Sequence, residues 1–289
     1  MRFTFSKFDK LGAPLLFASA VALFVLERKW QLRKRVRPEG ERLLRNGGIA
    51  ATALPALRLL LLPGMYAAAH WSGRHKAGLL HWFRLPDWLR YSFGFFLIDY
   101  SSYLWHVLLH KSDLLWRFHN VHHIDLDLDL STAWRFHVGE NIASVPIRGG
   151  MVALLGVPAK LVVGYEVLFE ACTAFHHSNM RLPFGFERYL CRLLVTPRMH
   201  GIHHSIVAQE TNSNFSVVLS CWDKLHNTLR LNVPQDAVTI GVPAYRNPQE
   251  QTLLKLLALP FGKQHGWQLP DGSVPERETS AGDEGKLSR

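Results

Sequence analysis

Four apolar segments constrain the fold of this chain more than any other feature. They cover residues 11–26, 47–69, 88–109 and 141–175. Segments of about 20 apolar residues can cross the hydrocarbon core as helices. The last one contains a Gly-Val-Pro turn at 156–158, which predicts a helical hairpin that enters the membrane and returns. Hydrophobic residues make up 48% of the chain and concentrate in these blocks. The pattern predicts an all-α integral membrane bundle of about four hydrophobic segments.

A basic stretch after the first apolar segment orients this bundle. Residues 27–45 hold eight Lys and Arg side chains, and the positive-inside rule places such a loop in the cytoplasm. The second segment then leaves and the third returns to the cytoplasmic side. The N-terminus, with Arg2, Lys7 and Lys10, would lie outside unless the first segment is re-entrant or interfacial. The formal charge of +10 fits an anionic membrane surface, and no nucleic-acid-binding motif is present.

Short histidine clusters follow the apolar segments. One has the spacing HxxxH and two have the spacing HxxHH, and these offsets place the rings on one face of a helix. Neutral imidazole is the commonest metal ligand in proteins. Eight imidazoles exceed what one ion needs, so we expect two metal ions. The clusters are His106 and His110, then His119, His122 and His123, and finally His200, His203 and His204.

A fourth histidine group, His176-His177, ends the helical hairpin and lies on the same side of the membrane in this topology. Imidazole ligands suit Zn, Fe, Cu or Ni. Iron fits best if the chemistry is oxidative, because an open position on Fe(II) can bind dioxygen. Thiolate ligands are disfavoured, because Cys172, Cys191 and Cys221 are widely spaced and form no CxxC pair. The sequence therefore predicts a cytoplasmic, histidine-rich helical cap on the bundle.

The order of these motifs resembles a known family. HxxxH, HxxHH, HHSN and HxxHH precede Asn214-Phe215-Ser216 and Trp222-Asp223-Lys224-Leu225, and over about residues 90–230 the set is similar to the fatty acid hydroxylase superfamily. The resemblance implies a multi-pass, non-haem di-iron oxygenase that uses dioxygen and external electrons to hydroxylate or desaturate a sterol, fatty acyl or related lipid. Zinc could replace iron in a purified sample. No haem domain is fused, so a separate electron carrier is implied, such as a cytochrome b5-like protein, a ferredoxin or a reductase.

The resemblance also implies residue roles. Asp99 and Asp223 match acidic positions and are expected to orient ligand imidazoles by accepting an N–H, and Asn179 of HHSN is placed beside the metals with them. His137 is either a further ligand or a hydrogen-bonded scaffold residue. Two departures, Val138 in place of Pro and His226-Asn227 in place of aromatic-Gly, leave the substrate open. The implied ligands are His106, His110, His119, His122, His123, one or both of His176 and His177, His200, His203 and His204.

Three regions follow from this interpretation. Residues 1–87 hold the N-terminal membrane segments and the basic loop, residues 88–230 the oxygenase core, and residues 231–289 a C-terminal extension. The tail from Gln264 is rich in Gly, Pro, Ser and acidic residues and is expected to be disordered. The alternating run Asp125–Asp129 is expected to be a solvated loop or strand edge.

Other functions explain the same residues less well. The clusters could be surface or hydrogen-bonded core histidines, but three of them on one membrane face disfavour this. A membrane metal-ion transporter or metal-binding protein would hold ligands near the bilayer midplane, whereas these clusters lie at helix ends. A zinc metalloprotease would need HExxH, which is absent.

Overall fold

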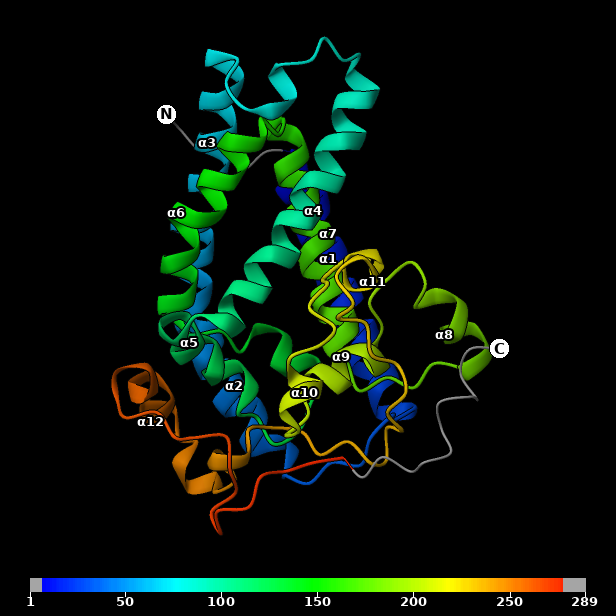
Figure 1. Cartoon of the computed structure of the whole chain (residues 1–289), viewed down its shortest axis with the longest axis vertical. Coiled ribbons are helices and arrows are strands. Elements are labelled where there is room, and N and C mark those ends of the chain that lie inside the picture. The colour runs from blue at the N-terminus through cyan, green and yellow to red at the C-terminus, as the bar shows by residue number, and fades with distance from the viewer. Residues whose placement is uncertain (1–6, 278–289) are drawn as a thin grey trace.

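The computed structural model describes residues 7–277, and its regular structure is helical (Figure 1). Isolated β-bridges occur in this range, but no strand does. The expected all-α class is therefore confirmed. The longer helices are α1 (Lys7–Lys29), α2 (Glu39–Ala56), α3 (Leu62–His75), α4 (Asp87–Lys111), α5 (Asp113–His123), α6 (Val138–Leu155) and α7 (Ala159–His177). The shorter elements are η1 (Leu57–Leu61), η2 (Leu79–His81), η3 (Leu130–Trp134), α8 (Phe184–Leu190), α9 (Pro197–His203), α10 (Ala208–Thr211), α11 (Cys221–Leu225), η4 (Pro243–Tyr245), η5 (Pro248–Glu250), α12 (Leu253–Ala258) and η6 (Leu259–Phe261).

The second apolar segment forms the longest helical stretch. α2 continues through the π-helical turn η1 directly into α3, and Pro55 and Pro63 flank that turn. A proline removes a backbone donor and widens the helix locally. Among the described residues, the stretch Glu39–His81 is the one helix long and apolar enough to cross a membrane.

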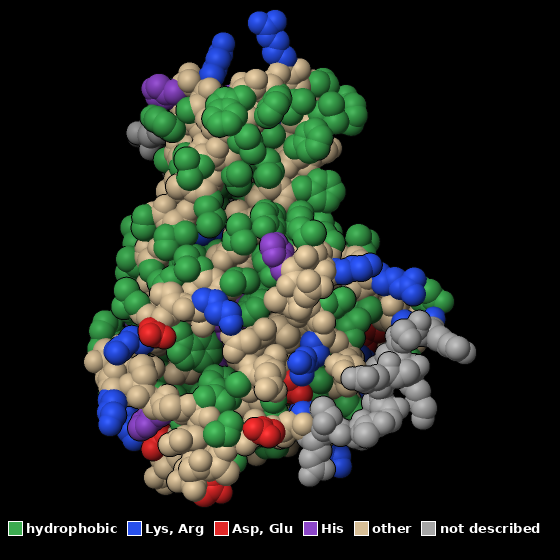
Figure 2. Space-filling view, in the orientation of Figure 1, with side chains coloured by type: hydrophobic (Ala, Val, Ile, Leu, Met, Phe, Trp, Pro, Cys, Tyr) green, Lys and Arg blue, Asp and Glu red, His purple; other side chains and the backbone are tan. Residues whose placement is uncertain are grey.

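Five long helices form an elongated apolar body. α3 packs against α6 and α7, α4 packs against the same two helices, and α1 runs along α7 as one uninterrupted helix. Buried Leu61, Met65, Ile98, Val152 and Tyr165 form the core between them. Figure 2 shows hydrophobic side chains over the end formed by α3, α4 and α6, while charged side chains gather toward the opposite end. We call these the apolar end and the histidine end.

Two glycines let the helices close at the apolar end. Gly156 ends α6 in the left-handed conformation with φ 73°, and Gly78 has φ 98°. A Cβ on Gly78 would lie 2.4 Å from the carbonyl oxygen of Ala153. Both features require glycine. Gly156 lies in the turn that joins α6 to α7, as the Gly-Val-Pro sequence predicted. Gly78 lies in the α3–α4 connection, which packs against that turn.

A buried ion network joins α2 to the chain that follows α5. The Arg42 guanidinium donates to both carboxylate oxygens of Asp125, at 3.0 and 2.8 Å, and to Asp129 at 2.5 Å. Asn46 adds a bond to Asp125 at 2.9 Å, and Asp127 caps the backbone of residues 36 and 37. The expectation of a solvated loop at 125–129 is wrong. Alternation of Asp with Leu does not show whether a matching arginine approaches from another helix.

The C-terminal extension packs on the histidine end. Val242, Tyr245 and Leu256 share a core with Ile49 of α2 and Val121 of α5. Tertiary contacts also fix the position of the chain beyond Gln264. Trp267 donates to the Ile206 carbonyl oxygen at 2.8 Å, and Arg277 pairs with the buried Glu210 at 2.8 Å. Disorder from Gln264 was therefore a wrong expectation up to Arg277, because tertiary contacts outweigh the polar composition. Residues 278–289 lie outside the described residues.

Candidate metal centre

The predicted histidines meet where four helices end. His110 lies in the last turn of α4, His123 in that of α5, His177 in that of α7 and His203 in that of α9. A helix C-terminus carries partial negative charge from its unpaired carbonyl groups and favours a cation. The four converging ends therefore make this region electrostatically suited to metal ions.

The histidines form two adjacent groups. In each group the candidate ligand atoms lie within 4.8 Å of one another. The groups touch through the stacked rings of His123 and His204, whose centroids are 4.3 Å apart. The first histidine group comprises His106, His110, His119, His123 and His203, and the second comprises His122, His177, His200 and His204. This pairing mixes residues from α4, α5, α7 and α9, so it does not follow the order of the sequence motifs.

Hydrogen bonds at the outer ring nitrogens set the tautomers. Nδ1 of His106 donates to the Phe215 carbonyl oxygen at 2.8 Å, and Nδ1 of His203 donates to that of Ser213 at 2.7 Å. Nδ1 of His177 donates to the Thr173 carbonyl oxygen at 2.8 Å. A neutral imidazole that donates from Nδ1 keeps a lone pair on Nε2. Each of these rings therefore has Nε2 available as a ligand.

The inner nitrogens converge without partners that could satisfy them all. In the second group, Nε2 of His177 lies 3.0 Å from Nε2 of both His122 and His200, and Nε2 of His204 lies 3.1 Å from that of His200. In the first group, Nε2 of His119 and of His203 is buried without a hydrogen-bond partner among the described residues. Buried lone pairs that face one another repel unless a proton or cation lies between them. The donor sets fit two metal ions.

Burial favours the neutral form of the imidazoles in both histidine groups. It lowers the pKa of His122, His123, His200, His203 and His204 well below the usual value, and the neighbouring imidazoles lower it further. Only the neutral ring has a lone pair to offer a metal. These five rings are therefore in the protonation state that coordination requires at neutral pH.

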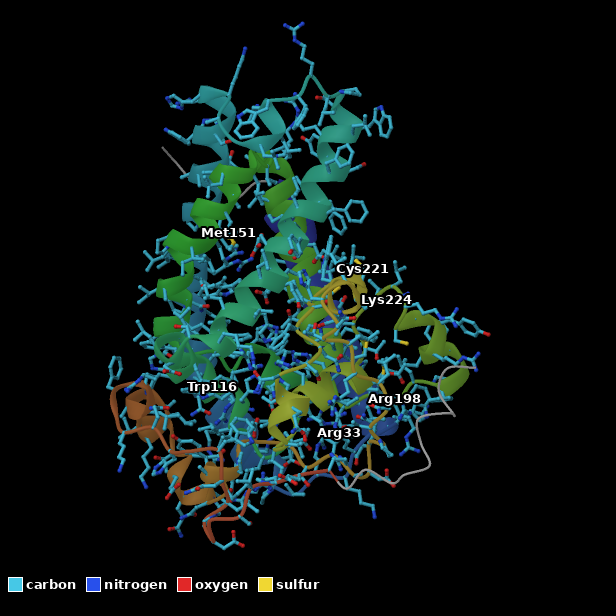
Figure 3. All side chains as sticks on the ribbon, viewed as in Figure 1. Arg33, Trp116, Met151, Arg198, Cys221 and Lys224 are labelled. Carbon is cyan, nitrogen blue, oxygen red and sulfur yellow. The ribbon has the colours of Figure 1, made fainter. Side chains whose placement is uncertain are left out.

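Aromatic side chains cover the centre. Phe136 stacks on His122 with centroids 4.5 Å apart, and Phe215 packs edge-on against His106 at 5.6 Å. The ring centroid of Trp116, a residue labelled in Figure 3, lies 5.0 Å from that of His110. These rings exclude water from the ligand nitrogens and lower the local dielectric.

Of the His176-His177 pair, the structure brings His177 into a group. His176 stands beside the second group, with its ring 4.1 Å from that of His200. One of its nitrogens bonds the backbone of Val217, and its Nδ1 is buried without a partner among the described residues. His176 also lines the pocket above the centre.

His137 and Asn179 lie outside both groups. His137 caps the N-terminus of α6, accepting from Gly139 N–H at 2.9 Å and donating to the Leu257 carbonyl oxygen at 3.1 Å. Both of its nitrogens are therefore engaged. Asn179 exchanges hydrogen bonds with the backbone of Arg33, at 2.9 and 2.8 Å. Their roles in the described structure are to join segments, because capping and loop contacts use the polar atoms that metal binding would need.

Among the described residues, no imidazole N–H donates to Asp99 or Asp223, and both carboxylates instead bond other parts of the chain. Asp223 accepts from the backbone N–H of Phe215 at 2.7 Å and of Ser216 at 2.9 Å. It thereby positions the carbonyl group that orients His106. Asp99 accepts from Trp222 at 2.7 Å and from Tyr165 at 2.9 Å. The expected direct bond to a ligand ring is corrected to an indirect one, since sequence proximity to the histidines does not set the direction of the carboxylate.

Glu140 makes the direct contact that we expected of Asp99 and Asp223. Both of its carboxylate oxygens lie 3.2 Å from Nδ1 of His119, and the side chain is buried. It lies in the first turn of α6, three residues after His137. The segment around His137 was noted in the sequence, but only the approach of α6 to α5 shows that Glu140 supports a ligand.

We expect the substitution Glu140→Gln to weaken metal binding by about 10- to 100-fold, because a neutral amide supports the imidazole less well than a carboxylate does. Competition between the purified protein and a chelator would measure this. Glu250→Gln, at an exposed position, is the matched control. Equal metal affinity in both variants would show that Glu140 does not tune the centre.

A pocket reaches the histidines from the apolar body. It encloses about 90 Å³. Its base includes His106, His119, His122 and His177. The apolar lining residues include Ala53, Leu57, Leu61 and Trp105, from α2, η1 and α4, and Phe169 from α7. The polar lining residues include Asn141, Ser144, Arg148, Glu170 and Thr173, from α6 and α7.

Fold and site together define an α-helical protein with a buried, all-histidine candidate metal centre beside a small pocket. Residues 91–228 match the sequence model of the fatty acid hydroxylase family, the family that the motifs indicated. No solved structure matches the chain.

Several characterised proteins are similar to this chain. The chain is 29% identical to ornithine lipid hydroxylase OlsE of Rhizobium tropici over 172 residues, which are 59% of this chain and 50% of that protein. It is 29% identical to human cholesterol 25-hydroxylase over 57% of this chain and 62% of that protein. It is 29% identical to human alkylglycerol monooxygenase over 50% of this chain and 32% of that protein. All three are oxidoreductases, so the expected enzyme class is confirmed for the matched region. The match spans less than two thirds of each relative.

Proposed function

We propose that the protein is a membrane-bound non-haem di-iron oxygenase that hydroxylates or desaturates a lipid with dioxygen. The observation that carries the proposal is the pair of buried imidazole groups at the base of a pocket that opens from an apolar helical body. Two ferrous ions, when bound, would supply the dioxygen chemistry that breaking an unactivated C–H bond requires. Electrons would come from a separate carrier protein.

The chain's own residues would bind the two ions and exclude water from them. The two histidine groups would bind the ions, and Glu140 and the carbonyl groups of residues 173, 213 and 215 would keep the ligand rings in the required tautomer. Phe136, Phe215 and Trp116 would exclude water. The apolar lining residues of the pocket would orient the lipid so that one C–H bond faces the ions.

We infer that the protein crosses the membrane several times, with the histidines facing the cytoplasm. Large exposed apolar side chains occur on several helices, including Phe17 of α1, Leu59 of η1, Phe93 of α4 and Leu154 of α6. The basic loop lies at the histidine end, because Arg33 donates to the Pro197 carbonyl oxygen of α9. The positive-inside rule then places that end in the cytoplasm.

Comparison of the lipids of a deletion strain and of its parent tests the proposed function. We expect at least one oxidised lipid to disappear in the deletion strain and to return with the wild-type gene but not with the His122→Ala variant. Identical lipid profiles would contradict the proposal. Uptake of ferrous or zinc ions by proteoliposomes holding the protein would instead support a metal transporter.

A further inference from the structure

We propose that the pocket receives the polar headgroup of the lipid, and not the hydrocarbon end of its chain. The oxidised carbon would then lie in or beside the headgroup. This inference rests on the proposed function. The shared chemistry of the headgroup is a compact group with both hydrogen-bond donors and acceptors, of the amino-acid, amide or glycerol kind.

The first argument is the set of polar side chains among the residues that line the pocket. Asn141, Ser144 and Arg148 follow one another at helical spacing along α6, and Glu170 and Thr173 do so along α7. Residues three and four apart lie on one face of a helix. Asn141 and Ser144 donate to the backbone carbonyl oxygens of Ala53 and Glu140, at 3.0 and 2.8 Å, so Arg148, Glu170 and Thr173 are the side chains that could meet a polar ligand group. The apolar lining residues provide the surface for the chain that continues from the headgroup.

The second argument is an ion pair inside the apolar body. Arg148 donates to Glu166 at 2.5 Å, and both side chains are buried, with 7% and 5% exposure. The Arg148 guanidinium also lies 5.0 Å from the centre of the Phe169 ring. A buried ion pair is weak as a stabilising device, and ionisable residues within membrane helices commonly mark a substrate path. Here the arginine lines the pocket and can meet an acceptor on the ligand.

The third argument is the hydroxyl group of Thr173. Thr173 is 4% exposed, and its Oγ1 has no hydrogen-bond partner among the described residues. A threonine inside a helix usually donates to the carbonyl group one turn earlier, and leaving the hydroxyl group unpaired costs stability. Its backbone oxygen accepts from Nδ1 of His177. A ligand group that bonds the Thr173 hydroxyl group is therefore one helical turn from a ligand of the second histidine group.

The size of the pocket agrees with this assignment. Its volume of about 90 Å³ is well below the range of about 300–1,000 Å³ typical for whole drug-sized ligands. Only the reacting fragment of a lipid fits without side-chain movement. Among the fragments of a lipid, the headgroup is the one that satisfies Arg148, Glu170 and Thr173 together.

Binding of short probes to the full-length protein in detergent tests the inference. The probes are N-octanoylglycine, 1-O-octylglycerol and octane, and the readout is the shift of the thermal unfolding midpoint with probe concentration. For the wild type we expect saturable shifts with at least one polar probe and none with octane. The probe that binds more tightly identifies the amide or the glycerol kind of headgroup.

Substitutions at Thr173 sharpen the test. We expect Thr173→Val to weaken binding of the polar probe by about threefold to tenfold, the effect of one lost hydrogen bond. Without a probe, this variant should unfold at the same or a higher temperature, because it removes an unpaired buried hydroxyl group. Thr173→Ser should restore binding. Thr52→Val is the control, since Thr52 lies on α2 outside the pocket and bonds the Ile49 carbonyl oxygen at 2.8 Å.

Two binding results would overturn the inference: no saturable shift with either polar probe, or polar-probe affinity unchanged by Thr173→Val. The location of the new oxygen in the oxidised lipid, determined by fragmentation mass spectrometry, is the second readout. Oxygen on a distant chain carbon, in a metal-containing active preparation, contradicts the headgroup inference alone. Absence of both metal and oxidised lipid contradicts the proposed function itself.

Discussion

Replacing His122 with alanine is expected to abolish lipid oxidation and to lower the bound metal to about half of the wild-type content or less. His122 belongs to the second histidine group, and its Nε2 lies 3.0 Å from that of His177. Loss of residues that merely orient a ligand reduces metal affinity by about 10- to 100-fold, so removal of a ligand itself should exceed that range. Elemental analysis of the purified protein and the amount of oxidised lipid measure the two effects.

The control for this substitution is His75→Ala. His75 is exposed in the last turn of α3, far along the chain from both groups, and bonds the Trp71 carbonyl oxygen. We expect wild-type metal content and activity in this variant. Full activity and full metal content in the His122 variant would refute the assignment of the second histidine group.

The second large effect is expected at Arg42. The substitution Arg42→Met should reduce the free energy of unfolding by about 3–5 kcal/mol, because it leaves buried carboxylates without their partner. Arg42 is 1% exposed and bonds Asp125 and Asp129. Burial alone would raise the pKa of Asp125, but Arg42 and Arg135 outweigh burial and hold that pKa well below its usual range. Removing the Arg42 guanidinium would leave burial opposed mainly by Arg135, so the pKa of Asp125 would rise and the buried carboxylates would lose the pairing that offsets their desolvation.

Denaturant unfolding of the purified protein in detergent would measure this loss. Arg37→Met is the matched control, since Arg37 pairs at 3.1 Å with Glu41, an exposed partner, and such surface pairs contribute about 0–1 kcal/mol. Similar losses in the two variants would show that the buried network does not stabilise the fold. Metal content should fall as well, because the Arg42 network anchors the chain that follows His122 and His123.

This network illustrates what spacing alone could not reveal. Asp125–Asp129 follows the second histidine cluster by two residues, and its composition resembles that of a solvated loop. The decisive fact is that α2 brings Arg42 and Asn46 against it. Buried charges are stable only when paired. The identity of the partner depends on helix packing across about 80 residues of sequence, and Arg42 was only one of eight basic residues in its loop.

The clustering of the candidate ligand histidines was predictable for a local reason. The HxxxH and HxxHH spacings match the helical repeat, so each motif necessarily presents its rings on one helix face. The apolar segments then required the motif-bearing helix ends to lie together. His106, His119 and His200 could therefore be identified before any tertiary contact was known.

The sequence by itself determined the all-α class, the candidate histidine ligands and the similarity to a known family, because helical periodicity and motif order are local properties of the chain. Tertiary structure alone decided which histidines share a group, that Glu140 contacts His119, that His137 and Asn179 join segments, and that Arg148, Glu170 and Thr173 line the pocket beside the histidines. Each of these depends on the approach of side chains from different helices. The packing of the apolar body sets those approaches, and no spacing within a single segment encodes them.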